Sequence, residues 1–354
     1  MTEKFSVYQH WDPLKVMIVG RSYAPELYDY ITNEKVRKVF YKIAEETEED
    51  YQKLTDLLTK LGVHVVRCNL DHDTAIAKQN IRYGKTISTP YAMQPRDGTI
   101  MLGETFYYQD HLKPALQEAI DLLESKGNKT SSTVPKTGFK YLDHDLYLNS
   151  AMTSRIGKDL IVGSITSEKV ENLPELQNIL QAQLPDYRIH MMDTQGHTDG
   201  TFCPVVPGLI VSITGSEKYY EKLFPGWEVV YLPGEAWGKV QNWMQLKQQN
   251  GGKWWVPGEE LNEDFTNYVE QWMNHWVGYV EESVFDVNMI VVDEKNVIVN
   301  GYNKKVFDAF EKRNITPHVC NFRHRYFWDG GLHCITSDIH RIGSMNDYFP
   351  TRNQ

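Results

Sequence analysis

The sequence feature that most constrains the fold is a recurring alternation of short apolar runs and helical patterns. Runs rich in Val and Ile and bounded by Gly, Asp or Asn are typical of buried strands. They lie at Val16 to Val19, His64 to Val66, Thr99 to Leu102, Leu160 to Val162, Leu209 to Ile213, Val229 to Leu232, Met289 to Val292 and Val297 to Val299. Helical patterns lie at Glu34 to Leu61, Asp110 to Ser125 and Lys304 to Lys312. Because strands and helices alternate, the sequence predicts an α/β or α+β protein.

The length of 354 residues suits either one large domain or two ordinary ones. No segment is rich enough in Gly, Ser or Pro to be a linker, so we predict one compact domain over residues 1–354. Residues 234–276 are unusually rich in Trp and lack a strand run. Two interpretations stay open for this insertion: a helical segment packed on the body, or a lid or interface that offers aromatic contacts.

The net charge of −10 argues against a nucleic-acid partner, which requires clustered Lys and Arg. A cationic small molecule suits this charge better. No basic segment followed by an apolar one opens the chain, and no run of about 18 apolar residues occurs. We therefore expect a cytoplasmic protein without a membrane anchor. The four cysteines show no CxxC pairing, which predicts reduced thiols and neither a disulfide framework nor a zinc knuckle.

One cysteine stands in a context that allows chemistry. Cys334 follows the paired glycines Gly330 and Gly331, which permit positive φ and close approach of a ligand to the backbone. A free cysteine is also among the most buried residue types. From these residues alone, a buried structural thiol and a nucleophile remain equally open.

Two further segments place reactive side chains beside glycines. His197 and Asp199 are two residues apart, so on an extended segment both would point to the same face, as a catalytic His and a substrate carboxylate would. The same pair could ligate a metal, although no third ligand at a recognisable spacing supports that. Arg96 and Asp97 precede the strand that begins at Thr99, and an ordinary turn remains an alternative there.

These segments together resemble, in the right order, the glycine amidinotransferase branch of the guanidino-modifying superfamily called penteins. The resemblance covers nearly the whole chain, and its motifs are WDPLKVMIVGR, PRDGTIML, YRIHMMD, GHTDGTF, VNMIVVDEKNVIV and, most specific, GGLHCITSDIHRIG. It implies an α/β fold in the form of a single-domain five-bladed β/α propeller, with pseudo-fivefold symmetry and the active site in a central channel. It also implies a homodimer and no cofactor or metal.

The resemblance assigns the reacting groups. Cys334 corresponds to the nucleophile and His197 to the general acid/base. Asp143 corresponds to the acid that orients the histidine, although the spacing of acids differs from the family pattern, so Asp145 is the alternative. The implied reaction moves the amidino group of arginine, or of a similar guanidino donor, to an amine acceptor through an S-amidino-cysteine.

The resemblance also assigns the substrate ligands. Asp97 and Asp199 correspond to the carboxylates that hold the guanidinium, and Arg96 and His333 are expected to contact substrate beside them. Asp286 takes the place of a family serine, and Asp329 takes that of a loop glycine. Because both changes add negative charge, we expect an acceptor or donor that carries an extra amine. A merely structural Asp286 is the alternative.

Two other functions remain open. A hydrolase of the same superfamily, releasing ammonia or urea, needs the same Cys, His and carboxylates, although the detailed resemblance favours transfer. A non-catalytic cation-binding or scaffold protein is the other alternative, and the presence of every expected polar group argues against it.

Overall fold

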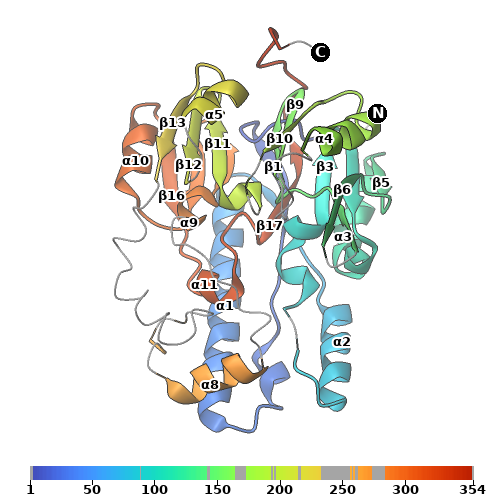
Figure 1. The fold of residues 1–354 in the computed structure, drawn as a ribbon. Coiled ribbons are helices and arrows are strands. Elements are labelled where there is room, and N and C mark those ends of the chain that lie inside the picture. The colour runs from blue at the N-terminus through green and yellow to red at the C-terminus, as the bar shows by residue number, and fades with distance from the viewer. Residues whose placement is uncertain are drawn as a thin grey trace.

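The computed structural model describes residues 3–87, 89–141, 144–163, 173–192, 194, 197–213, 217–232, 256, 258–259, 262–272 and 284–352 (Figure 1). Its strands form five three-stranded sheets and one hairpin. The strands are β1 (Leu14–Val19), β2 (His64–Arg67) and β17 (Thr336–Arg341); β3 (Thr99–Leu102), β4 (Thr105–Tyr108) and β5 (Lys129–Ser131); β8 (Thr153–Ile156), β9 (Asp159–Gly163) and β10 (Arg188–Met192); β11 (Phe202–Val206), β12 (Leu209–Ser212) and β13 (Glu228–Tyr231); β14 (Ile290–Asp293), β15 (Asn296–Val299) and β16 (Thr316–Val319); and the hairpin of β6 (Lys136–Tyr141) and β7 (His144–Tyr147).

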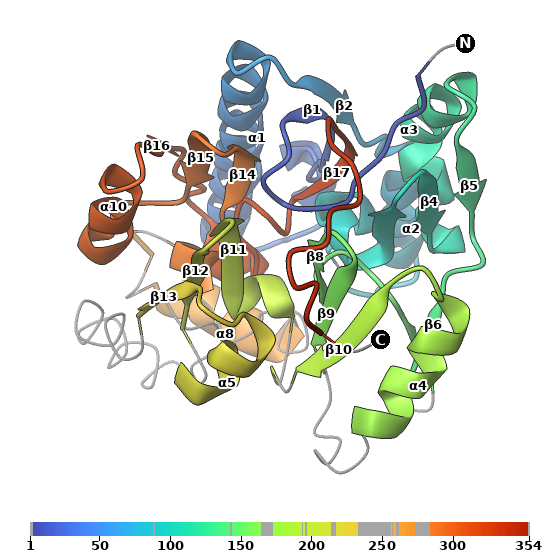
Figure 2. The ribbon, with the colours of Figure 1, turned by 90° about the horizontal axis from the view of Figure 1, so that it is seen from above.

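The five sheets repeat one pattern. In each, the middle strand pairs antiparallel with one neighbour and parallel with the other, as β4 does with β3 and β5. A helix connects each parallel pair, because parallel strands require a crossover. Seen from above, the sheets surround a shared centre (Figure 2). The described residues form no closed barrel.

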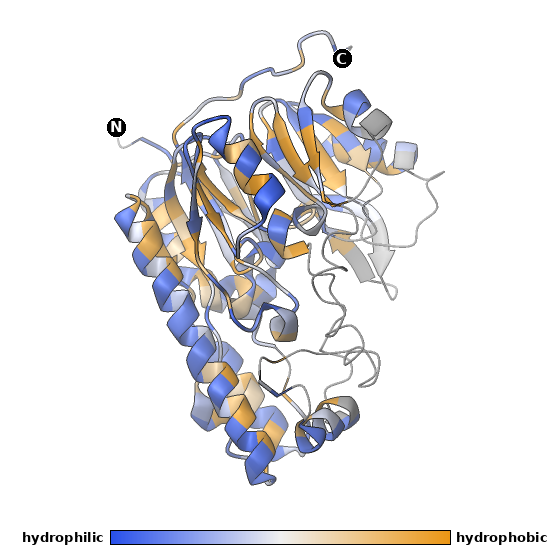
Figure 3. Ribbon diagram, turned by 90° about the vertical axis from the view of Figure 1, so that its left-hand side faces the viewer, coloured by the Kyte–Doolittle hydropathy of each residue, from blue (hydrophilic) through white to orange (hydrophobic). Residues whose placement is uncertain are grey.

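The helices lie outside the strands, and strands rich in apolar residues pack behind them (Figure 3). The α-helices are α1 (Glu34–Lys60), α2 (Asp71–Arg82), α3 (Lys113–Ser125), α4 (Leu173–Gln183), α5 (Glu217–Leu223), α8 (Glu263–Trp272), α9 (Val284–Val287), α10 (Lys304–Glu311) and α11 (Arg325–Trp328). Short 3-10 helices are η1 (Pro25–Tyr28), η2 (Tyr91–Met93), η3 (Pro95–Gly98), η4 (Asp110–Leu112) and η6 (Thr198–Gly200).

The predicted strands and helices are confirmed to within a few residues. The run Thr99 to Leu102 matches β3 at both ends. The predicted helix over Asp110 to Ser125 begins as η4 and continues as α3. Of the Trp-rich insertion, α8 is described and packs on α1, where Phe265 contacts Phe40 with ring centroids 5.5 Å apart. Most of residues 234–276 lie outside the described residues, so the choice between a packed helical insertion and a lid stays a prediction.

Helix α1 fixes two of the segments that the sequence singled out. The Asn33 side chain caps its N-terminus, and Gly62 (φ 81°) follows its C-terminus. From its buried face, the Tyr51 hydroxyl donates to the carbonyl of Met93, just before η3, at 2.8 Å. The Thr47 hydroxyl accepts a hydrogen bond at 2.8 Å from the indole of Trp328, which lies just before the loop that carries Cys334. One long helix therefore holds both segments in place.

The shared centre is charged. Asp338 of β17 is buried and accepts from Arg155 of β8 at 2.5 Å and from Arg341 at 2.6 Å, and Arg96 of η3 lies 3.5 Å away. Burial would raise the pKa of Asp338, but these three guanidinium groups hold it well below its usual value. Three elements distant in sequence thus meet on one carboxylate.

Candidate functional site

The cysteine lies in the loop of residues 330–335, called here the nucleophile loop, between α11 and β17. Asp329 ends α11 with φ 53°, in the left-handed region where glycine is most common and Asp is tolerated. The family glycine at this position is therefore replaced by a residue that can still end the helix.

Cys334 is 8% exposed and its sulfur lies between an amide and a carboxylate. The Asn288 Nδ2 donates to Cys334 Sγ at 3.0 Å, and Asp199 Oδ2 lies 3.7 Å from the sulfur. The Asn288 Oδ1 accepts from the backbone N–H groups of His333 at 2.9 Å and of Cys334 at 3.3 Å. Asn288 thus contacts both the sulfur and the backbone that carries it.

Gly330 and Gly331 allow neighbouring side chains to pack closely against the loop backbone. Neither Gly330 nor Gly331 has a positive φ, so that part of the prediction is wrong. A Cβ on Gly331 would lie 2.6 Å from Asn288 Oδ1, and one on Gly330 would lie 2.6 Å from Gln94 Nε2. The close approach that glycine permits here is to these side chains, which hold the loop.

His333 and Asp199 form a buried pair. The His333 Nδ1 lies 2.9 Å from Asp199 Oδ2. Burial, with Arg96 nearby, lowers the pKa of His333 to about 4, so the ring is neutral and Nδ1 carries its proton toward the carboxylate. Burial would raise the pKa of Asp199, but the hydrogen bond from His333 and the nearby His197 outweigh it, so the pKa lies below its usual value. Asp199 therefore stays ionised beside the sulfur.

The segment of His197 and Asp199 is not extended. Thr198–Gly200 is the 3-10 helix η6, because the Thr201 hydroxyl and backbone N–H bond back to His197 and Thr198. The two side chains therefore have different partners. Asp199 contacts the nucleophile loop, whereas His197 Nδ1 lies 3.8 Å from Asp97 Oδ1.

Asp97 borders the site from η3. Its side chain is partly exposed, but Oδ1 is buried and accepts no hydrogen bond from the described residues, with His197 Nδ1 3.8 Å away. Desolvation raises the pKa of Asp97 to about 6. Asp199 raises this pKa further, whereas His197 lowers it. Asp199 Oδ1 is likewise buried without a hydrogen-bond partner in the described part of the chain. Each of these two oxygens could accept a further hydrogen bond.

Arg96 supports the nucleophile loop. It is fully buried, and its Nε donates to the carbonyls of His333 at 2.6 Å and Thr336 at 2.9 Å. The Arg96 guanidinium also lies 3.5 Å from Asp338. Arg96 therefore holds the loop in this arrangement, and its predicted contact with substrate stays a prediction.

The free thiol is poorly ionised. Burial raises the pKa of Cys334 well above its usual value, and the carboxylates of Asp199 and Asp97 raise it further. Hydrogen bonds from the Gly331 backbone and from Asn288 act in the opposite direction. A fast-reacting Cys334 is therefore not expected in the free protein, and a bound cation would favour the thiolate.

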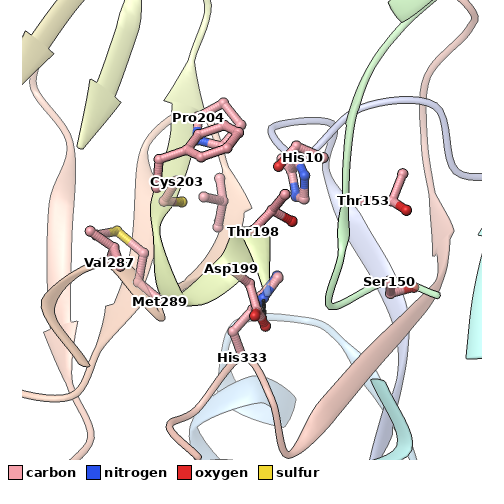
Figure 4. A pocket seen from close by; sticks show the side chains of 13 residues that line it. His10, Ser150, Thr153, Thr198, Asp199, Cys203, Pro204, Val287, Met289 and His333 are labelled. Carbon is pink, nitrogen blue, oxygen red and sulfur yellow. Dashed lines mark hydrogen bonds and ion pairs between the residues drawn. The ribbon is translucent and has the colours of Figure 1, made fainter. Parts of the chain in front are cut away.

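A small cavity borders the Asp199 and His333 pair (Figure 4). His10, Ser150, Thr153 and Cys203 also line it, and its volume is about 10 Å³. Such a space holds about one water and no substrate. Asp97 borders a separate surface hollow of about 340 Å³, which residues of η2, η3 and η4 line.

The remaining predicted residues are placed as follows. Asp286 of α9 is half-buried, and its Oδ2 accepts from Asn303 Nδ2 at 2.8 Å. Asp143 lies outside the described residues, and so does the side chain of Asp145, whose backbone belongs to β7. Within the described parts of the chain, no group of three or more His, Cys, Asp or Glu side chains is arranged to hold a metal ion.

Sequence reasoning missed Asn288. It lies between apolar neighbours just before β14, which made it look like part of a strand. The structure buries it completely, and a buried polar amide needs partners for its hydrogen-bonding groups.

Comparisons with known proteins find similarity to amidinotransferases. No protein-family model matches the chain. Glycine amidinotransferase, mitochondrial, of Xenopus tropicalis is 22% identical over 401 residues, covering 97% of this chain and 84% of that protein. Inosamine-phosphate amidinotransferase 1 of Streptomyces glaucescens is 22% identical over 387 residues, covering 97% and 98%. The solved inosamine-phosphate amidinotransferase of Streptomyces griseus matches with a TM-score of 0.64 and 19% identity, covering 97% and 99%. The resemblance to amidinotransferases is confirmed, and the α/β fold is theirs.

None of the described helices is both long and apolar enough to cross a membrane.

Proposed function

We propose that this chain is an amidinotransferase that moves the amidino group of arginine to an amine through a covalent adduct on Cys334. The observation that carries the mechanism is a buried sulfur 3.7 Å from the Asp199 carboxylate, with Asp97 as a second acid that acts on it. Among the described residues, one buried oxygen of each acid accepts no hydrogen bond. Such surroundings oppose a thiolate unless a cation binds. A cationic substrate therefore completes the site.

A guanidinium suits the two carboxylates. It is planar and remains protonated, and its N–H groups pair with carboxylates through charge-assisted hydrogen bonds. Asp97 and Asp199 would fix its plane and preserve the positive charge that makes its carbon open to attack. Their charge would at the same time be neutralised, which favours ionisation of Cys334.

The reaction then proceeds in two halves. The Cys334 thiol passes its proton to His197, and the sulfur forms a bond to the guanidino carbon. His197 then gives that proton to the nitrogen of the departing ornithine as its carbon–nitrogen bond breaks. An S-amidino-cysteine remains. The acceptor amine attacks the same carbon and gives a proton to His197, and the carbon–sulfur bond breaks to restore the thiolate. Asp143, or Asp145, would orient His197.

Water in place of the amine would turn the enzyme into a hydrolase. The decisive experiment incubates the protein with arginine, with and without a panel of amines, and quantifies ornithine, citrulline, urea and ammonia. Transfer gives ornithine only with an amine. Citrulline, or urea without an amine, would show hydrolysis instead. Mass spectrometry after rapid quenching should find the amidino mass on Cys334, and a Cys334→Ser variant should be inactive.

The acceptor is proposed to carry a second amine. Asp286 lies on α9, which packs against η6, and it adds a carboxylate near the site. A diamine would be attracted to it more than glycine would. In an Asp286→Ser variant, the preference for diamines over glycine should fall. An unchanged preference would support the merely structural role, with Asp286 bonded to Asn303.

The five-bladed propeller, its fivefold symmetry and its central channel are part of the same proposal. The repeated strand pattern of the five sheets supports them. Contact of His333 with substrate, the single domain, the homodimer and the cytoplasmic location also remain predictions.

A further inference from the structure

We propose that Asn288 is a catalytic residue, whose side-chain N–H stabilises the Cys334 thiolate when the sulfur attacks the donor. This inference rests on the proposed function, because it assigns a role in the first half of that reaction. Asn288 touches the reacting atom, with Nδ2 at 3.0 Å from Sγ. Asn288 lies in the motif VNMIVVDEKNVIV, but the resemblance assigned it no role.

The contacts of Asn288 fix which end of its amide faces the sulfur. On one side, Oδ1 meets two backbone N–H donors, those of His333 and Cys334. On the other, Nδ2 meets two acceptors, the Asp199 carbonyl at 3.2 Å and the Cys334 sulfur. A flipped amide would place oxygen against these acceptors and N–H against donors. The N–H that faces the sulfur is therefore set by the network.

The amide is also held rigidly. Asn288 is 0% exposed, and Asn300 Nδ2 donates to its carbonyl at 2.8 Å and to that of Phe285 at 2.9 Å. Asn300 Oδ1 accepts from the Leu332 N–H at 3.3 Å, which ties the nucleophile loop to the same pair. A donor held in place before the reaction needs no reorganisation when negative charge forms on the sulfur.

The charges around the sulfur explain why such a donor is needed. Two acids, Asp199 and Asp97, raise the pKa of Cys334 and so act against a thiolate. Hydrogen bonds from the Gly331 backbone and from the Asn288 side chain lower that pKa and favour the thiolate. The titratable and charged groups that interact with Cys334 or lie beside it are Asp97, Asp199, His333, Arg96 and Tyr51. Arg96 is engaged with the loop carbonyls, and His333 is neutral. Asn288 is thus the side-chain donor placed directly on the sulfur.

The test uses Asn288→Asp in the full chain. The variant keeps an acceptor for the two backbone N–H groups and replaces the donor that faces the sulfur. Quenched-flow mass spectrometry would follow formation of the S-amidino adduct with arginine between pH 6 and 10. The rate at neutral pH should fall about 10- to 100-fold, as for loss of a hydrogen bond to a charged group, and its pH midpoint should rise.

Two controls separate this role from folding and from binding. Asn300→Asp makes the same isosteric change one contact away from the sulfur, so it should lower thermal stability and move the pH midpoint much less than Asn288→Asp does. Arginine affinity, measured by calorimetry in a Cys334→Ser background, should change less than about threefold when Asn288→Asp is added, since Asn288 is assigned to the thiolate. If Asn288→Asp does not fold, Asn288→Ala provides the same comparison.

The outcomes are distinguishable. If the wild-type protein never forms the adduct, the proposed function fails. If it does and the Asn288 variants keep its rate and pH midpoint, the role of Asn288 is wrong. Equal shifts in the Asn288 and Asn300 variants would also overturn it, because loop distortion would then explain both.

Discussion

At the scale of single residues, we expect Asp97 to make donor binding depend on pH. Its pKa is raised to about 6, so its carboxyl is protonated below that pH and ionised above it. Because a cation prefers the ionised form, arginine affinity should fall as pH drops through 6, by about tenfold per unit at most. Calorimetry in a Cys334→Ser background would measure this.

The matching variant is Asp97→Asn. It should weaken arginine binding at pH 7.5 by about 10- to 100-fold and reduce the pH dependence. Glu104→Gln, at an exposed carboxylate that pairs with Lys4, should leave both unchanged. An affinity that Asp97→Asn leaves intact would remove Asp97 from the donor site.

Arg96 offers a second test at this scale. As a positioning residue, it should affect turnover more than donor binding. Arg96→Met removes the Nε donor that holds the His333 and Thr336 carbonyls, so kcat should fall at least about tenfold while KM for arginine changes little. A large rise in KM with kcat preserved would instead restore the predicted contact with substrate.

Among single residues, the sequence predicted the reactive side chains better than it predicted the residues that contact them. Cys334 and Asp199 stand out through their glycine-rich neighbourhoods, and the structure brings them together. Asn288 was not recognised, and the contacts of Arg96 with the loop were not predicted, because both depend on backbone groups far away in sequence. No local pattern encodes such contacts.

At the scale of elements, the conformation of the nucleophile loop requires glycine, which has no side chain, at position 331. A Cβ on Gly331 would lie 2.6 Å from Asn288 Oδ1 and 3.0 Å from Phe285. Gly331→Ala should therefore displace Asn288, lower stability by about 1–3 kcal/mol and strongly reduce activity.

The matched control for this loop is Gly301→Ala. Gly301 has no positive φ, and its added Cβ would meet nothing within 4 Å. Its stability should stay within about 0.5 kcal/mol of wild type. Denaturant unfolding of both variants would check the pair, and equal effects would contradict the packing argument.

Strands were predictable where a run of apolar residues indicates that both faces of the strand are buried. Strand β3 is fully buried and was found with correct ends. Strands β5 and β16 lie at sheet edges and are largely exposed, so they carry no such run. Strand β17 is buried but polar, because it supplies Asp338 and Arg341 to the charged centre. An apolar pattern therefore does not identify a buried strand whose side chains form ion pairs.

At the scale of the whole molecule, the ion cluster on Asp338 joins three distant elements. Asp338→Asn would leave three buried guanidinium groups with a weaker partner, so the free energy of unfolding should fall by about 3–5 kcal/mol. Asp308→Asn, which affects an exposed pair with Lys304, should leave the unfolding midpoint unchanged.

The pH dependence of this loss has a definite sign. Because the folded pKa of Asp338 is lowered, its stabilisation is fully present above the unfolded value of about 3.9 and is lost as pH falls toward the folded value. The difference between wild type and Asp338→Asn should be constant from pH 5 to 8 and shrink below about pH 4. A difference that changed between pH 5 and 8 would contradict this assignment.

The pairing of β1 with β17 has a consequence for how the protein is made. During synthesis β1 leaves the ribosome early, and its antiparallel neighbour emerges only after all four other sheets. Until then β1 keeps one bare edge, open to other strands or to a chaperone. Since Cys334 immediately precedes β17, we expect the enzyme to gain its reactive sulfur only in the last step of folding.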